Sequence, residues 1–133
     1  QRGGASLTAL SAAIGQTVDA ARAAGGEAAD LAADLEASWH QLVEVTMSMF
    51  ASGDVEAAMA NSAVYLEAFG HIVIAWMWLE QFVATNGHPG DFYEGKRQAA
   101  RYFFRYELPR TGPQIQLLRS LDRTTVDMRP EWF

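Results

Sequence analysis

The sequence contains no cysteine among its 133 residues. This absence excludes a disulfide framework, a thiol nucleophile and a metal site built on thiolates. It also fits a reducing compartment, so we expect a cytoplasmic protein. The alternating pattern of a half-buried strand is missing as well, and the chain has no internal repeat. What remains is helical periodicity, and the sequence therefore predicts an all-α domain.

The known catalytic motifs are also missing. We find no glycine-rich phosphate loop, no Gly-x-Ser-x-Gly elbow, no His-Glu-x-x-His motif and no nucleophile–base signature. The first residues lack the basic region and long apolar core of a signal peptide. The chain begins with Gln1 rather than Met. We therefore expect residues 1–133 to be a single helical domain without catalytic residues, the C-terminal fragment of a longer polypeptide.

Positive charge is scarce in the first half of the chain. The net charge is −6, which argues against nucleic acid as a partner. Residues 1–60 contain eight acidic and two basic side chains, whereas residues 61–133 are balanced. The most apolar run, Ala68–Leu79, is shorter than the roughly 20 residues that a bilayer requires. His71 interrupts the run, and Glu67 and Glu80 flank it. We therefore expect no membrane span.

Apolar residues recur at intervals of three and four along most of the chain, which is the pattern of amphipathic helices. Glycine-containing breakers separate the periodic segments, at positions 25–26, 52–53 and 86–90. The predicted helices cover about residues 6–24, 27–51, 54–86, 92–108 and 113–121. Pro109 is expected to end the fourth of them. Short connections between long helices indicate an up-down four-helix bundle, with a short fifth helix and a C-terminal tail. Trp132 and Phe133 in the tail are candidates to fold back onto the bundle.

The segment from Asp54 to Asn86 is expected to be the central helix. It carries two adjacent apolar stripes, which predict burial on most of its circumference. One stripe is Val55, Met59, Ser62, Leu66, Phe69, Val73 and Trp76, and the other is Tyr65, Phe69, Ile72, Trp76, Leu79 and Val83. Gly70 lies in the middle, where glycine costs about 1 kcal/mol relative to alanine. We expect a neighbouring helix to approach closely at that point.

Three arginines, Arg97, Arg101 and Arg105, form a stripe along the predicted fourth helix. Guanidinium groups in such an array suit the phosphates of a nucleotide or of coenzyme A. Ion pairs with acids of the second helix, or with Glu94 and Glu107, explain the same pattern. The sequence leaves both interpretations open.

Glu36, His40 and Glu44 share one face of the second predicted helix. Such a triplet could hold a metal ion, and a solvated polar face is the alternative. His71 is either a buried catalytic base or a histidine satisfied within the core or an interface. His88 lies in a loop of glycine and proline without an evident partner.

Several short motifs carry a family resemblance. They are Gly70 with the segment Ala75–Leu79, then Phe92–Lys96, Ala99–Phe104, and Leu108 with Pro109. In this order they resemble the extra C-terminal domain of long bacterial acyl-CoA dehydrogenases. These include the group that acts on 3-methylthiopropanoyl-CoA. The resemblance covers roughly residues 31–116.

The resemblance implies a parent flavoenzyme that uses FAD to desaturate acyl-CoA thioesters between the α and β carbons. In that family a carboxylate removes the α proton and a hydride moves to the flavin, at sites that lie upstream of the extra domain. It implies that residues 1–133 form an accessory and dimerisation domain, without a cofactor or enzymatic activity of their own. The expected partners are the parent's catalytic domains and a second copy. The alternative is a helical module that binds coenzyme A or protein through the arginine stripe.

Overall fold

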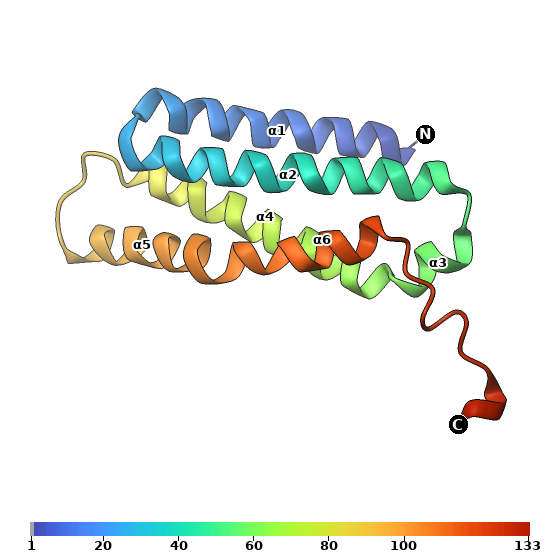
Figure 1. The fold of residues 1–133 in the computed structure, drawn as a ribbon. Coiled ribbons are helices and arrows are strands. Elements are labelled where there is room, and N and C mark those ends of the chain that lie inside the picture. The colour runs from blue at the N-terminus through green and yellow to red at the C-terminus, as the bar shows by residue number, and fades with distance from the viewer. Residues whose placement is uncertain (1) are drawn as a thin grey trace.

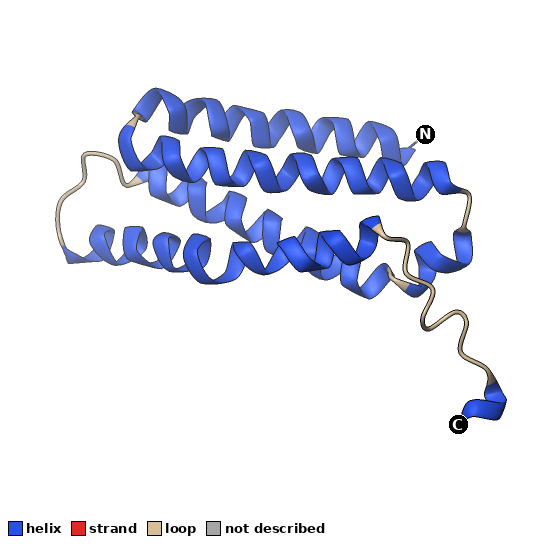
Figure 2. Cartoon of the chain, in the orientation of Figure 1, coloured by secondary structure: helices blue, strands red, loops and turns tan. Residues whose placement is uncertain are grey.

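The structure, a computed structural model, describes the chain from Arg2 to Phe133, and Gln1 lies outside the described residues. The described part is all-α, as the periodicity predicts (Figure 2). The helices are α1 (Arg2–Ala24), α2 (Gly26–Ser52), α3 (Val55–Ala60), α4 (Ser62–Ala84), α5 (Asp91–Tyr102), η1 (Phe103–Glu107), η2 (Leu108–Arg110), α6 (Thr111–Arg119) and η3 (Pro130–Trp132).

The long helices run antiparallel to their neighbours in sequence (Figure 1). α1 and α2 form a hairpin, α4 returns behind them, and the rod from α5 to α6 runs back along the front. α4 contacts α1, α2, α3, α5 and α6. The predicted up-down bundle is thus present, with α4 at its centre.

The core is formed by side chains that recur at helical spacing on the facing sides of these helices. Ile14, Leu35, Leu42, Ile72 and Leu79 are among the largest fully buried side chains. Truncating one such side chain to alanine typically costs about 2–5 kcal/mol. The second of the two stripes predicted for the central helix is confirmed at Ile72 and Leu79, which are fully buried. The core therefore stabilises the bundle from within, without a disulfide.

The central helix is not continuous, which differs from the single helix predicted over residues 54–86. It divides at Asn61 into α3 and α4. The buried Asn61 side chain donates hydrogen bonds to the carbonyl oxygens of Ala57 (2.9 Å) and Asp122 (2.8 Å). Asparagine disfavours helix interiors because its side chain competes for backbone groups. Asn61 thus both marks the break and attaches the C-terminal segment to the bundle.

Pro109 does not end the fourth helix, contrary to the prediction. The helical path continues through the π-helical turn η1 and the 3₁₀ turn η2 into α6. Proline has no N–H to donate and its ring crowds the preceding turn of an α-helix. At η1 and η2 the backbone hydrogen bonds change from the α-helical pattern to the π-helical and 3₁₀ patterns. The helical path can therefore continue past Pro109. The last two predicted helices therefore form one continuous bent rod.

The tail leaves the bundle instead of folding back onto it, so that prediction is wrong. Residues 124–133 extend away from the other helices (Figure 1), and Trp132 and Phe133 are 62% and 95% exposed. The junction with the bundle is well anchored. Arg123 forms an ion pair with Asp54 at the start of α3, next to the hydrogen bond from Asn61 to Asp122. We call residues 124–133 the C-terminal arm.

The first of the two stripes predicted for the central helix is buried only in part, since Phe69 and Trp76 pack against the core. Val55, Met59 and Leu66 are exposed in the bundle. A β-carbon placed at Gly70 would meet nothing within 4 Å, so no helix of the domain approaches closely there. The bundle thus buries one side of α4 and leaves much of the opposite side uncovered.

Candidate functional site

Two arginines of the predicted stripe hold one end of the bundle together. Arg101 on α5 donates from Nε and Nη2 to the carboxylate of Glu27 on α2, at 2.7 and 3.0 Å, and from Nη1 to Glu94 at 3.1 Å. This two-point geometry is the strongest that an arginine forms with a carboxylate. Glu27 and Glu94 together raise the pKa of the Arg101 guanidinium. Arg101 therefore ties α5 to the beginning of α2.

Arg97 closes the loop between α4 and α5. Its Nη1 and Nη2 donate to the carbonyl oxygens of Thr85 (2.9 Å) and His88 (3.2 Å), and its Nε donates to Glu94 (3.1 Å). Hydrogen bonds from Arg101, and secondarily from Arg97, hold the pKa of Glu94 below its usual value. Arg97 thus satisfies carbonyl groups that the end of α4 leaves free.

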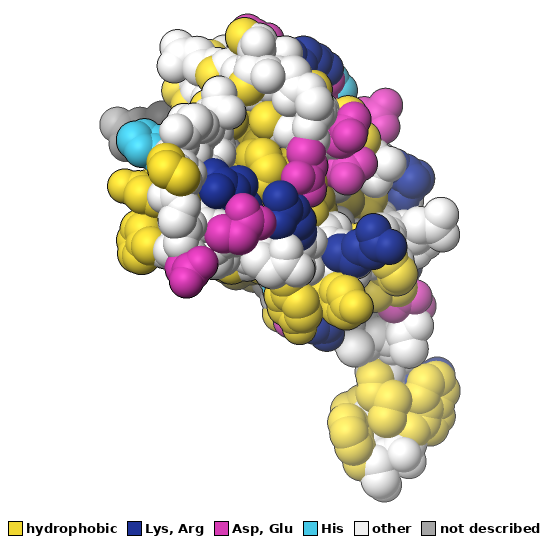
Figure 3. Space-filling view, turned by 90° about the vertical axis from the view of Figure 1, so that its left-hand side faces the viewer, with side chains coloured by type: hydrophobic (Ala, Val, Ile, Leu, Met, Phe, Trp, Pro, Cys, Tyr) yellow, Lys and Arg dark blue, Asp and Glu magenta, His cyan; other side chains and the backbone are white. Residues whose placement is uncertain are grey.

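A hollow of about 460 Å³ lies beside these two arginines, lined mainly by the α1–α2 turn and the α4–α5 loop. Basic and acidic side chains alternate on this end of the molecule (Figure 3). Arg97 and Arg101 already donate to Glu27, Glu94 and backbone carbonyls, so a phosphate would have to displace a carboxylate. The contacts follow the ion-pair interpretation of the stripe. Arg105, its third member, is exposed on η1.

His71 lies at the contact between α4 and η1. Its Nε2 is 3.1 Å from Oε1 of Glu107, and its ring centroid is 5.8 Å from that of Phe103. Arg110 also donates to Glu107, at 3.4 Å. These contacts match a histidine that is satisfied at an interface between helices.

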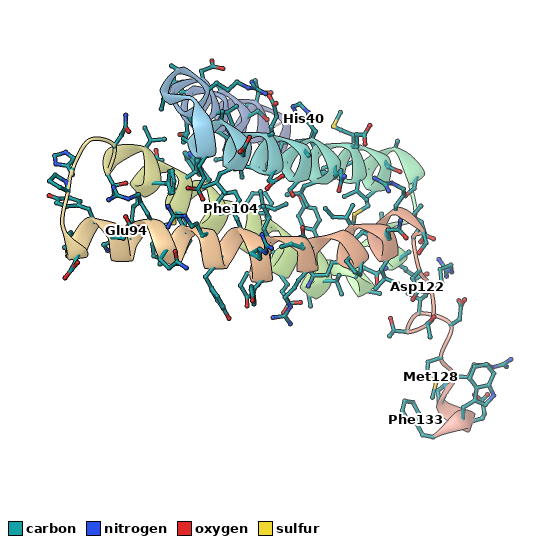
Figure 4. The ribbon with its side chains drawn as sticks, turned by 60° about the vertical axis from the view of Figure 1, so that its left-hand side comes forward. His40, Glu94, Phe104, Asp122, Met128 and Phe133 are labelled. Carbon is teal, nitrogen blue, oxygen red and sulfur yellow. The ribbon has the colours of Figure 1, made fainter. Side chains whose placement is uncertain are left out.

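The metal candidates are engaged elsewhere. Glu36 pairs with Arg22 of α1, and Glu44 lies 3.9 Å from Arg119 of α6. His40 is exposed on the outer side of α2 (Figure 4). Among the described residues, no three or more histidine or carboxylate side chains are close enough to share a metal ion.

The indole groups of Trp39, which is buried, and of Trp76, which is half-buried, donate hydrogen bonds within the bundle. Trp76 of α4 donates to the Thr17 hydroxyl of α1 at 2.7 Å, and that hydroxyl lies 3.4 Å from a carboxylate oxygen of Glu80. Trp39 of α2 donates to Ser11 of α1 at 3.0 Å. Buried aromatic residues with a polar tip normally find such partners. These two contacts join α1 to α2 and to α4.

The most unusual surface is the outward face of α4, which we define by Leu66, Ile74 and Met77. These side chains are 66%, 42% and 52% exposed. By length and composition α4 could cross a membrane, with a mean hydropathy of 1.3, yet only 22% of its most apolar window is buried in the bundle. Large uncovered apolar surfaces mark sites of contact with another protein surface or a membrane.

A second apolar surface lies at the opposite end of the bundle from the arginines. We call it the terminal groove and define it by Met49, Phe50, Val55 and Met59, from α2 and α3. Two adjoining hollows of about 310 and 190 Å³ open along it, and a third of about 600 Å³ continues between α1, α2 and α4. Phe50 lines all three hollows and is 76% exposed.

Periodicity alone did not reveal these two surfaces. It identified Val55, Met59 and Leu66 as core residues, because an apolar side chain at helical spacing looks the same whether its own domain or a partner covers it. The sequence did contain one indication of these surfaces. The central segment has more apolar residues than one side of a helix can bury.

Comparison with known proteins gives one result. A family model described as acetyl-CoA dehydrogenase C-terminal like matches residues 10–129, which is most of the chain. Neither a curated protein nor a solved structure gave a match.

Proposed function

The chain belongs to the acetyl-CoA dehydrogenase C-terminal-like family, and on that basis we propose that it is the helical accessory domain of an FAD-dependent acyl-CoA dehydrogenase. In this proposal the parent enzyme desaturates acyl-CoA thioesters between the α and β carbons, in the cytoplasm. The group acting on 3-methylthiopropanoyl-CoA is the subtype that the sequence motifs favour. The flavin, the substrate and the catalytic carboxylate belong to other domains of the parent chain.

The role of the bundle is to cover and support those domains. The observation that carries this role is the outward face of α4, where Leu66, Ile74 and Met77 are left uncovered on a helix that contacts every other long helix. A catalytic domain packed against this face would bury it. The surface surrounding Gly70 is open, so a partner helix could approach the α4 backbone closely there.

Protein contact explains the outward face better than a membrane does. A membrane-spanning α4 would have to leave the bundle, and Ile72 and Leu79 would lose the core that they fill. It would also separate the Trp76 indole from Thr17. We therefore propose the catalytic domains and a second copy of the chain as partners, without a membrane span and without nucleic acid.

The test is to purify the full-length protein that carries this sequence, and to compare it with a version lacking residues 1–133. We expect the full-length protein to copurify with flavin and to reduce an electron-accepting dye when given acyl-CoA. Removing the domain should lower the unfolding temperature and the retention of flavin. The isolated 133 residues should be colourless and inactive. Flavin absorbance or acyl-CoA oxidation by the isolated domain would contradict the proposal.

A further inference from the structure

The loop between α4 and α5, residues 85–90, contains two neighbouring residues that can react with each other. Asn86 is followed by Gly87, and both are exposed. The chain has one other asparagine, Asn61, which is buried and donates two hydrogen bonds from its side-chain amide. Asparagine is among the thermolabile residues of proteins, because its side-chain carbonyl carbon lies within reach of the next backbone nitrogen. Asn86 differs from Asn61 in exposure, in hydrogen bonding and in the residue that follows it.

The backbone nitrogen of Gly87 is free to act as the attacking group. Its N–H donates to no acceptor in the described part of the chain. Gly87 has no side chain to shield this nitrogen, and a β-carbon built there would meet nothing within 4 Å. Approach of the Asn86 side chain to the nitrogen is therefore unhindered by neighbouring atoms.

The turn that contains both residues restrains the reaction. The N–H of His88 donates to the carbonyl oxygen of Thr85 at 3.0 Å, and Gly87 has a φ of +78°. A positive φ at this place is that of the third residue of a type II turn. Closing a succinimide ring between the Asn86 side chain and the Gly87 nitrogen requires the backbone at Asn86 to rotate out of the turn. The reaction therefore proceeds through local opening of the loop.

Arg97 of α5 holds this turn closed. Its Nη1 and Nη2 donate to the carbonyl oxygens of Thr85 (2.9 Å) and His88 (3.2 Å), which lie on either side of residues 86–87. Hydrogen bonds from a charged donor are stronger than those between neutral groups. Rotation of the backbone at Asn86 would move both carbonyl groups relative to the guanidinium. The contact thus raises the free energy of the open turn.

We propose that Asn86 is a site of spontaneous deamidation and that Arg97 slows the reaction by holding the turn. The Gly87 nitrogen loses its proton to water, attacks the side-chain carbonyl carbon of Asn86 and forms a new C–N bond. The bond between that carbon and the amide nitrogen breaks, and the nitrogen takes up a proton and leaves as ammonia. Water then opens the succinimide ring at one of its two carbonyl groups, which gives aspartate or isoaspartate. Water is the co-reactant, and nothing is oxidised or reduced.

The product changes the charge in the hollow beside the arginines. Asn86 lines this hollow together with Arg97 and Arg101. The new carboxylate therefore competes with Glu27 and Glu94 for these guanidinium groups. Isoaspartate also adds a methylene group to the backbone of the loop. The reaction needs this chain and water alone, so it is independent of the activity of the parent enzyme.

Peptide mapping of the full-length protein tests both parts of the proposal. The native protein is incubated at mildly alkaline pH and is then digested, at mildly acidic pH, with a protease that cleaves after glutamate. This cleavage isolates Asn86 in residues 81–94 and Asn61 in residues 57–67. We expect the first peptide to gain mass, as an amide becomes an acid, and to separate into aspartate and isoaspartate forms. The second peptide should stay unchanged.

Arg97→Ala should make the conversion of Asn86 about 10-fold faster, because the turn opens more easily without the two hydrogen bonds. Arg105→Ala, at an exposed arginine on η1, is the matched control and should leave the rate unchanged. If Asn86 stays intact in the native protein under conditions that convert it in the urea-unfolded protein, the site is overturned. Equal rates in wild type and Arg97→Ala overturn the role of Arg97. Conversion of Asn61 alongside Asn86 in Arg97→Ala also overturns that role, because it would indicate that the whole bundle had opened.

Discussion

Replacing Leu66 and Met77 by glutamine tests whether the outward face of α4 is covered in the full-length protein. Glutamine has nearly the helix propensity of leucine and methionine, so the change removes apolar surface without weakening the helix. Complete burial of such a side chain contributes about 1.5–3 kcal/mol relative to exposure. About two-thirds of Leu66 and half of Met77 remain exposed in the bundle. A covering domain would therefore gain about 1–2 kcal/mol at Leu66 and about 1 kcal/mol at Met77.

The expected effect of the double variant is a loss of about 2–3 kcal/mol in the free energy that keeps the covering domain in place. Hydrogen exchange of the α4 amides can be measured by mass spectrometry on the full-length protein. The exchange rate reports this free energy, because the α4 amides exchange through local opening of the structure. A loss of 2 kcal/mol makes exchange about 30-fold faster where opening is at equilibrium. Leu117→Gln, an exposed leucine on α6, is the matched control and should have little effect. If α4 exchanges no faster in the double variant than in this control, nothing covers the face and the reasoning is refuted.

Four further predictions concern single residues. Gly70→Ala should raise the unfolding free energy by about 0.5–1 kcal/mol in urea titrations of the domain, because alanine favours a helix and nothing lies within 4 Å of the added β-carbon; a loss would reveal a close neighbour. Arg101→Ala should lower that energy by about 1 kcal/mol, since it breaks the pairs with Glu27 and Glu94, whereas the exposed Arg105→Ala should change it little. Calorimetry should show no heat with coenzyme A for wild type or Arg101→Ala, and binding that is lost in Arg101→Ala would restore the phosphate interpretation. Hydrogen bonds from Arg101 and Arg97 hold the folded-state pKa of Glu94 below its usual 4.5. The contribution of Glu94 to stability is therefore complete above pH 4.5 and disappears as the pH falls through the lower, folded-state pKa. Glu94→Gln should be less stable than wild type at about pH 6, and the difference should shrink as the pH is lowered below 4.5; a difference that does not change with pH would refute the assignment.

The sequence predicted the interior of this bundle well and its surfaces poorly. Ile72 and Leu79 were identified correctly because burial between helices imposes a spacing of three and four. Leu66 has the same spacing on the same helix and is exposed. Spacing reports that a side chain will be covered and contains no information about which molecule covers it.

The breaks in the helices were hard to place for a different reason. Asn61 divides the central helix through a hydrogen bond to Asp122, a residue 61 positions further along, and a local window does not include such a partner. Pro109 was expected to end a helix, but the π-helical turn before it carries the chain onward. The sequence left two interpretations of the arginine stripe open, and it contained no sign of the contact between Arg101 and Glu27, which are 74 positions apart.

The π-helical turn η1 also affects how this chain tolerates change in length. A single π turn is geometrically equivalent to one extra residue in an α-helix. Deleting one residue within Phe103–Glu107 would convert the wide turn into an ordinary α-helical turn, because the wide turn already absorbs the extra residue. Ile115 and Leu118, now buried, would then keep close to their present orientation, whereas the same deletion in a regular α-helical turn would rotate them by about 100°. We therefore expect this short segment to tolerate the loss of one residue better than the regular turns of α5 do.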